Sequence, residues 1–221
     1  MGHSNISARN LRLFVSLLAG GLLSILMVAV FSPSAFAGNL PVKDACSAVI
    51  GWESNLIANG DAEANLGAND ATTVVTPDCW NASSSFTAVR YGASDFPVSG
   101  TVPNGGANFF AGGPNSAVAT ATQLSDISSL SQTIDSGNVI ATLSGFLGGF
   151  AQQADHMVVI AEFRTGEQQT LGQIQIGPVT VQERANTTTL LARSTSGKVP
   201  VGARQVVLTM RATRAEGTYN D

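Results

Sequence analysis

The segment 59–70 carries the densest group of acidic side chains, Asp61, Glu63 and Asp70. Carboxylate oxygens on a loop that contains glycine suit Ca²⁺, which takes about six to eight oxygen ligands including backbone carbonyls. The spacing differs from that of an EF-hand loop. The alternative is a solvated turn in which the Asp and Asn side chains bond to their own backbone. The segment therefore predicts either a structural, non-catalytic calcium site or a plain turn.

Several aromatic side chains are candidates for stacking against a sugar. A sugar offers C–H faces that stack on rings and hydroxyl groups that bond to amides and carboxylates. Phe109 and Phe110 are adjacent, so their rings point to opposite faces of a strand, and we expect one in the core and one exposed. Each ring could instead belong to the core. The candidates for a sugar-binding surface are Trp80, Tyr91, Phe96, Phe109 and Phe110.

Hydrolytic chemistry has little support in the sequence. A Ser-His-Asp arrangement would have to use His156, which opens the most apolar predicted strand, and the chain has no Gly-x-Ser-x-Gly segment. We expect His156 to be a strand-end residue partly in solvent. A carboxylate pair for glycoside hydrolysis depends on a spatial separation that sequence spacing does not determine. We therefore predict a non-catalytic protein, with an extracellular glycan-active enzyme as an alternative.

The composition excludes several classes of protein. Only 12% of the residues are charged, whereas glycine (23 residues) and small polar residues are abundant. A coiled coil or a charge-driven disordered tail needs many more charges, and small polar residues favour turns and open sheet faces. With 15 acidic and 11 basic side chains, the chain lacks the basic surface that binds phosphates. We predict an all-β protein that does not bind nucleic acid.

The N-terminus has the pattern of a secretory signal. Arg9 and Arg12 precede an apolar run over 13–31, and the small-x-small site Ala35-Phe36-Ala37 follows. This order indicates a signal helix over 1–37 that is cut after Ala37. The apolar run is nearly long enough to span a bilayer, so an uncleaved anchor is the alternative. We predict a secreted or cell-surface protein with no membrane contact after cleavage.

Both cysteines, Cys46 and Cys79, lie in the predicted exported part. An oxidising compartment allows them to form a disulfide. The alternative is two buried free thiols. A structural zinc site is not expected, because two cysteines and His156 do not supply four soft ligands.

Period-2 alternation of apolar and polar residues recurs along the rest of the chain. In 139–144 the odd positions are apolar and Thr142 and Ser144 are polar, which is typical of a strand with one buried face. The segment 156–163 is apolar on both faces up to Glu162, which predicts a central strand covered on both sides. Only 178–184 has the character of a short helix. Strands are predicted over 55–59, 72–76, 85–91, 108–111, 118–124, 139–147, 156–164, 171–176, 188–193 and 205–212.

About ten short strands with this spacing favour a two-sheet antiparallel β-sandwich, and the jelly roll is the common form at this size. No internal repeat of a solenoid or propeller is present. The predicted organisation is a signal peptide over 1–37, an N-terminal strap over 38–54, and a jelly-roll sandwich over 55–221.

The segment Asn55-Leu56-Ile57-Ala58-Asn59-Gly60-Asp61-Ala62-Glu63 resembles the opening of galactose-binding-like jelly rolls, the fold of many carbohydrate-binding modules. The segments 78–80, 105–113 and 143–149 are also similar to secreted bacterial members, and the resemblance covers 55–221. It implies a carbohydrate ligand and a structural calcium ion held by the Glu of this opening and an Asp near the chain's end. In this sequence those ligands are Glu63, Asp61 and Asp221.

The chain departs from this family at its C-terminus. Such domains commonly continue into a further strand after a segment like 217–221, whereas this sequence ends at Asp221. We expect either a fragment or a sandwich that lacks its last strand and leaves its first strand partly unpaired.

The leading hypothesis is a secreted, non-catalytic jelly-roll domain that binds an extracellular glycan, a surface polymer or another extracellular ligand. One disulfide and one calcium ion would stabilise it. The alternative is a structural or adhesive surface protein without a small ligand, which uses its Gly-, Ser-, Thr- and Asn-rich faces for protein contacts. Exposed aromatics beside Asn, Gln or Asp would favour sugar binding, and a flat polar face would favour the structural role.

Overall fold

The computed structural model describes residues 9–14, 46, 50–52, 54–83, 85–94, 96–98 and 105–221. Its regular structure is almost wholly β, which confirms the all-β prediction. Helical structure in these residues is limited to the short elements η1 (Ser128–Leu130) and α1 (Ser131–Ile134). The predicted helix over 178–184 is instead loop and turn. The strands are β1 (Arg9–Phe14), β2 (Asn81–Ala82), β3 (Thr87–Arg90), β4 (Asn108–Ala111), β5 (Gly113–Pro114), β6 (Val118–Asp126), β7 (Val139–Gly149), β8 (His156–Arg164), β9 (Thr170–Ile176), β10 (Thr189–Lys198), β11 (Gln205–Thr213) and β12 (Tyr219–Asn220).

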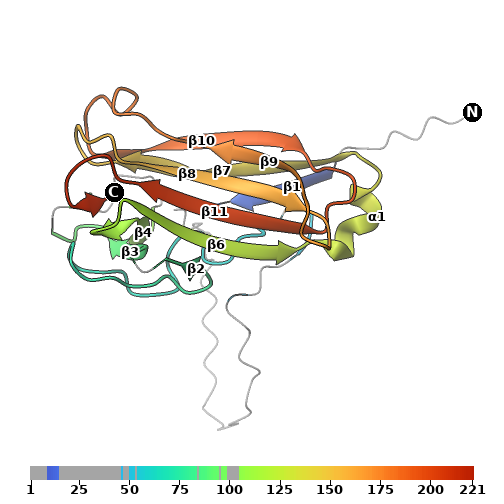
Figure 1. The fold of residues 1–221 in the computed structure, drawn as a ribbon, viewed down its shortest axis with the longest axis horizontal. Helices are drawn as coiled ribbons and strands as arrows, with labels where there is room; N and C mark the ends of the chain where they lie inside the picture. The colour runs from blue at the N-terminus through green and yellow to red at the C-terminus, as the bar shows by residue number, and fades with distance from the viewer. Residues whose placement is uncertain are drawn as a thin grey trace, which may run out of the picture.

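Two sheets carry most of these strands (Figure 1). The larger sheet has the order β2-β6-β11-β8-β9, and all neighbours in it are antiparallel. The other sheet has the order β1-β7-β10, in which β10 is antiparallel and β1 parallel to β7. From β6 to β11 the chain changes sheet at every connection except the one between β8 and β9. The short pairs β3-β4 and β5-β12 lie beside these sheets.

One hydrophobic core joins the two sheets. From β7 it contains Val139, Ala141 and Leu143, which are fully buried at the positions that the alternation predicts. From β11 it contains Leu208 and Met210, also buried. Because alternate residues of a strand point to opposite faces, apolar residues at every second position give each sheet one buried face.

Strand β8 is buried on one face only, so the prediction of a strand covered on both sides is wrong. Val159 and Phe163 are buried, whereas Val158 and Ile160 on the other face are half-buried. β8 lies between β11 and β9, and Val158 stands opposite Arg211. Cross-strand neighbours shield apolar side chains on an open sheet face, and a second covering layer is not required.

Two predicted strands, 55–59 and 72–76, are irregular in the structure. Along 55–59, side chains take the place of a strand partner. The Gln123 side chain accepts a bond from the Ala58 N–H and donates to the Ala58 carbonyl, and the Ser125 hydroxyl donates to the Leu56 carbonyl. These bonds satisfy the buried backbone without a ladder, so an apolar sequence such as 55–59 need not form a strand.

Within the predicted signal segment 1–37, the structure describes only Arg9–Phe14. These six residues form β1 along the edge of β7, so the predicted signal helix is wrong for them. An edge strand offers unpaired N–H and C=O groups that an extended chain can satisfy. The predicted cleavage site after Ala37 and most of the strap over 38–54 lie outside the described residues. Among the residues that are described, no helix has the length and apolar character needed to cross a membrane.

The disulfide between Cys46 and Cys79 is present, as predicted. The next residue, Trp80, is buried, and its Nε1–H donates to the Asn59 carbonyl at 3.0 Å. The disulfide therefore ties the strap to a turn that is itself anchored in the core.

Replacing both cysteines by alanine (C46A/C79A) should lower the free energy of unfolding by about 3 kcal/mol, because the disulfide restricts the unfolded chain. Its two half-cystines are 33 residues apart. Urea unfolding followed by tryptophan fluorescence measures this loss. A reducing agent should cause a similar loss in the unmodified protein and no change in the double variant. Equal stability of the two proteins without reductant would contradict the prediction.

Candidate functional site

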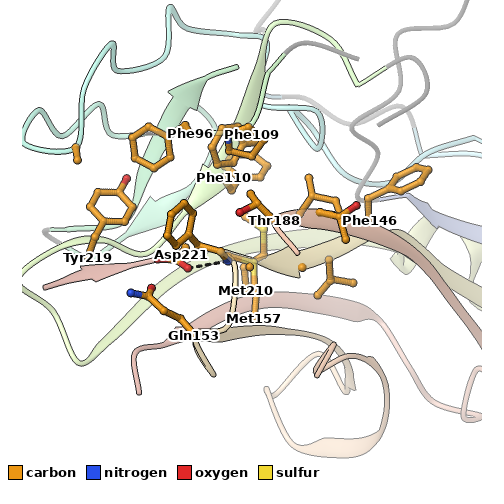
Figure 2. A pocket seen from close by; sticks show the side chains of 18 of the residues that line it. Phe96, Phe109, Phe110, Phe146, Gln153, Met157, Thr188, Met210, Tyr219 and Asp221 are labelled. Carbon is orange, nitrogen blue, oxygen red and sulfur yellow. Dashed lines mark hydrogen bonds between the residues drawn. The ribbon is translucent and has the colours of Figure 1, made fainter. Parts of the chain in front are cut away.

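A cavity of about 290 Å³ lies at one end of the two sheets, and we call it the end cavity (Figure 2). Its walls come from β4, the last residues of β7, the first residues of β8 and β10, the end of β11 and the segment 217–221. Most of the lining side chains are apolar. They are Ala71, Phe96, Pro97, Phe109, Phe110, Phe146, Leu147, Phe150, Met157, Val159, Leu190 and Met210, with Gln153, Thr188, Thr189, Thr218, Tyr219 and Asp221 as the polar ones.

An aromatic cluster forms one wall of the end cavity. The Phe96 ring lies edge-on to Phe109 and Tyr219, at centroid distances of 5.8 and 5.1 Å. Phe110 points away from this cluster and packs on Trp80 at 5.8 Å. The pleat of β4 therefore places the two adjacent phenylalanines on opposite faces, as expected, but Phe110 is half-buried rather than exposed. Both contribute to the lining.

The wall opposite the aromatic cluster consists of aliphatic and thioether side chains. Met157 and Val159 come from one face of β8, and Met210 comes from β11. At this end β7 and β10 approach closely, since a side chain at Gly148 would collide with the Thr189 carbonyl oxygen. Figure 2 shows Met157 and Met210 on the far side of the cavity from the Phe96 and Phe109 rings.

The main polar group of the end cavity is the Asp221 carboxylate. Its Oδ2 accepts a hydrogen bond from the Phe150 N–H at 2.9 Å. Burial, and next the negative charge of Asp155, raise the pKa of Asp221 to about 6, and the Phe150 N–H and the Arg184 charge oppose this only in part. The Tyr219 hydroxyl is buried without a hydrogen-bond partner in the described part of the chain, and burial raises its pKa.

Arg184 holds the loop that forms the polar wall. It is 1% exposed, and its Nη atoms donate to the carbonyls of Gly149, Ala151, Gln153 and Thr187 at 2.7–2.9 Å. Burial lowers the pKa of its guanidinium. These bonds position Phe150, whose N–H reaches Asp221.

Sequence reasoning missed Arg184 and Asp155. Asp155 is buried, and its Oδ1 accepts bonds from the N–H groups of Ala215 and Glu216. The only signal for either residue was a charged side chain next to a glycine-rich or turn segment, and this is common on protein surfaces.

The predicted sugar-stacking residues are buried or half-buried and pack on one another in pairs. Trp80 and Phe109 are each 7% exposed, and Phe110 and Tyr91 are half-buried. Tyr91 stacks on Phe109 with a centroid distance of 4.9 Å. Of the five candidates, Phe96, Phe109 and Phe110 line the end cavity, whereas Trp80 and Tyr91 do not. No pair of them forms an open surface platform, because the β3-β4 pair packs its rings inward.

The predicted calcium ligands have protein partners. The Glu63 Oε1 accepts the N–H groups of Ala107 and Asn108 at 2.8 and 2.9 Å, and the Asp61 Oδ1 accepts the Glu63 N–H. Asp221 belongs instead to the end cavity. Across the described ranges, no three His, Cys, Asp or Glu side chains gather in a group that could hold a metal ion. Calcium binding stays a prediction.

The rest of the acidic segment also forms turns through its own side chains. The Asp70 carboxylate accepts bonds from the hydroxyls and N–H groups of Thr72 and Thr73. These bonds lower its pKa to about 2. Asn59 Oδ1 likewise accepts the Ala64 N–H. This is the pattern of the solvated-turn alternative.

Neither a protein-family model nor a curated protein sequence matches this chain. Among solved structures, the chain is similar to the enzymatically active domain of tailspike protein 4 from bacteriophage CBA120. The TM-score is 0.38 and the sequence identity is 10%, over 75% of this chain and 21% of that one. The chain thus spans about a fifth of that structure, and a likeness this weak assigns neither a fold family nor an activity.

Replacing Glu63 by alanine should lower the free energy of unfolding by about 1 kcal/mol, because two N–H groups lose their acceptor. Urea unfolding with and without the chelator EGTA measures this. The hydrogen bonds predict the same loss in both conditions, and Glu167→Ala, at an exposed position, should cause none. Destabilisation by EGTA of the unmodified protein, but not of Glu63→Ala, would support a calcium ion instead.

Replacing Asp221 by asparagine should raise the free energy of unfolding at pH 7.5 by roughly 1–3 kcal/mol. The raised pKa of Asp221 means that its contribution to stability is full below its ordinary pKa of 3.8 and is lost as the pH rises through about 6. The gain should therefore be small at about pH 4 and grow up to about pH 7. Urea unfolding of both proteins across this range measures it, and a gain independent of pH would contradict the prediction.

Proposed function

We propose that this chain is an extracellular, non-catalytic binding domain that takes a small ligand into the end cavity. The observation that carries the proposal is the lining itself, in which Phe, Met and Leu walls surround a few polar side chains. Ligand sites are commonly concave and mostly apolar, with a small number of polar groups that fix orientation.

The lining favours a ligand with an apolar body. A free sugar buried here would leave most of its hydroxyls without partners, and each buried, unpaired polar group costs about 1–3 kcal/mol. Gln153, Thr188 and Asp221 supply only a few bonding positions, and the Thr188 hydroxyl already accepts the Ala151 N–H. A glycan therefore fits this proposal only where it presents a C–H face or an apolar substituent to Phe109 and Phe110.

The extracellular location rests on two features of the chain. The disulfide between Cys46 and Cys79 is the kind of bond that persists in an oxidising compartment. The predicted signal peptide over 1–37 would deliver the chain to such a compartment, and its cleavage would remove β1 from the edge of β7. A jelly-roll arrangement of the two sheets belongs to the same proposal.

The non-catalytic role is supported by the chemistry of the lining. Glycoside hydrolysis generally uses two carboxylates that flank the bond to be broken. In the described part of the chain, Asp221 is the only carboxylate among the lining residues. His156, the only histidine of the predicted exported part, bonds through Nδ1 to the Ala154 carbonyl at the start of β8.

A structural or adhesive role is the second candidate, and the outer face of β10 favours it. Ala192, Ser194 and Ser196 are exposed there, and the Ser196 hydroxyl bonds to Thr142 of β7 at 2.8 Å. These residues give the outer face of β10 small and polar side chains. This face lies on strands that also border the end cavity, so both roles can belong to one domain.

A cavity-filling variant tests the ligand site. The neutral dye N-phenyl-1-naphthylamine should bind the unmodified protein with one site and increased fluorescence. Leu190→Trp places an indole in the lining and should weaken binding about tenfold, a change of about 1.4 kcal/mol.

Leu124→Trp is the matched control, because Leu124 is 55% exposed on β6 and does not line the end cavity. It should leave dye binding unchanged. Absence of binding to the unmodified protein, or equal binding by the two tryptophan variants, would overturn the proposed site.

A further inference from the structure

The charge of the end cavity has one sign. Of its described lining residues, Asp221 is the only one whose side chain is charged at neutral pH, and none is Lys, Arg or His. The apolar walls exclude much of the water that would otherwise stabilise this carboxylate. A ligand that brings a positive charge would therefore gain an interaction that a neutral ligand of the same shape would not.

The neighbouring charges do not neutralise Asp221 completely. Arg184 directs its Nη atoms to four backbone carbonyls. Asp155 lies close enough to both groups to affect their titration, and its Oδ2 is buried without a hydrogen-bond partner in the described chain. Two carboxylates thus lie within electrostatic range of one guanidinium that donates to backbone carbonyls instead, which leaves an excess of negative charge behind the polar wall.

The aromatic wall of the end cavity also suits a cation. Figure 2 shows the rings of Phe96 and Phe109 across the cavity from Asp221. Tyr219 adds a third ring, 5.1 Å from Phe96. An ammonium group within about 6 Å of a ring face is attracted by about 0.5–2 kcal/mol, and most strongly where water is excluded.

We propose that the end cavity selects organic cations, namely ligands with an aromatic or alkyl body and one ammonium group. The ammonium group lies between the Asp221 carboxylate and the aromatic cluster, and the body packs on Met157 and Val159. This inference rests on the proposed function and specifies the class of ligand.

The pH dependence of binding follows from the groups that face Asp221. These are Asp155 from the loop before β8, Arg184 from the loop before β10, and Tyr219 of β12. Because the pKa of Asp221 is raised to about 6, its carboxylate is ionised at pH 7.5 and largely protonated at pH 5. The preference for a cation should therefore be present at pH 7.5 and lost at pH 5.

The test compares 2-phenylethylammonium with its neutral analogue 2-phenylethanol by isothermal titration calorimetry at pH 7.5. The unmodified protein should bind the cation about tenfold more tightly. Asp221→Asn should reduce this ratio to about one. Asp78→Asn, which removes an exposed charge that does not line the cavity, should retain the ratio. At pH 5 the unmodified protein should bind the two compounds equally, which tests the role of the carboxylate without a substitution.

The outcomes separate the two proposals. Equal binding of both compounds to the unmodified protein would overturn the cation preference and leave the proposed binding function intact. A preference that survives Asp221→Asn, or that falls equally in Asp78→Asn, would assign it to the overall negative charge and overturn this site. Binding of neither compound would remove the ligand site itself and the inference with it.

Discussion

The buried guanidinium of Arg184 is the interaction on which the end cavity depends. Burying a charged group is costly unless its donors are satisfied, and here the Nη atoms bond to the carbonyls of Gly149, Ala151, Gln153 and Thr187. These carbonyls belong to the connection from β7 to β8 and to the approach to β10. One side chain thus joins the end of β7, the loop that leads to β8 and the approach to β10, and it fixes the N–H of Phe150, which in turn holds Asp221.

The acidic side chains differ in how many hydrogen bonds the fold provides to their carboxylates. The carboxylates of Glu63, Asp70 and Asp155 each accept two or more hydrogen bonds from nearby backbone or hydroxyl groups. Asp221 accepts the Phe150 N–H and otherwise faces an apolar cavity. A carboxylate in such surroundings favours its neutral form or a cationic partner. Among the acidic residues singled out in the sequence, the tertiary structure therefore places Asp221 in a largely apolar cavity, whereas Glu63 ties two loops together.

The strands after residue 108 were largely predictable, because each has a buried face and alternation with a period of two marks it directly. β7 and β11 are clear cases, with Ala141 and Leu208 at positions that the pattern places inward. The segments 55–59 and 72–76 were not, because side chains bind backbone groups that a neighbouring strand would otherwise pair. Gln123 binds Ala58 in this way, and the Thr87 hydroxyl accepts the Val75 N–H. The sequence pattern also did not predict that β8 is buried on only one face. Lateral contacts shield Val158 and Ile160 on the other face much as a second layer would.

The sequence by itself determined the all-β class, the alternation of the main strands and the availability of two cysteines for a disulfide. These properties depend on residue type and local spacing. Only the tertiary structure decided that Phe96, Phe109, Tyr219 and Asp221 share one cavity, because β4, the loop before it and the C-terminal segment are brought together by sheet packing over more than a hundred residues of chain. It also decided the role of Arg184, since a guanidinium becomes a structural centre only where carbonyl groups from distant segments converge on it.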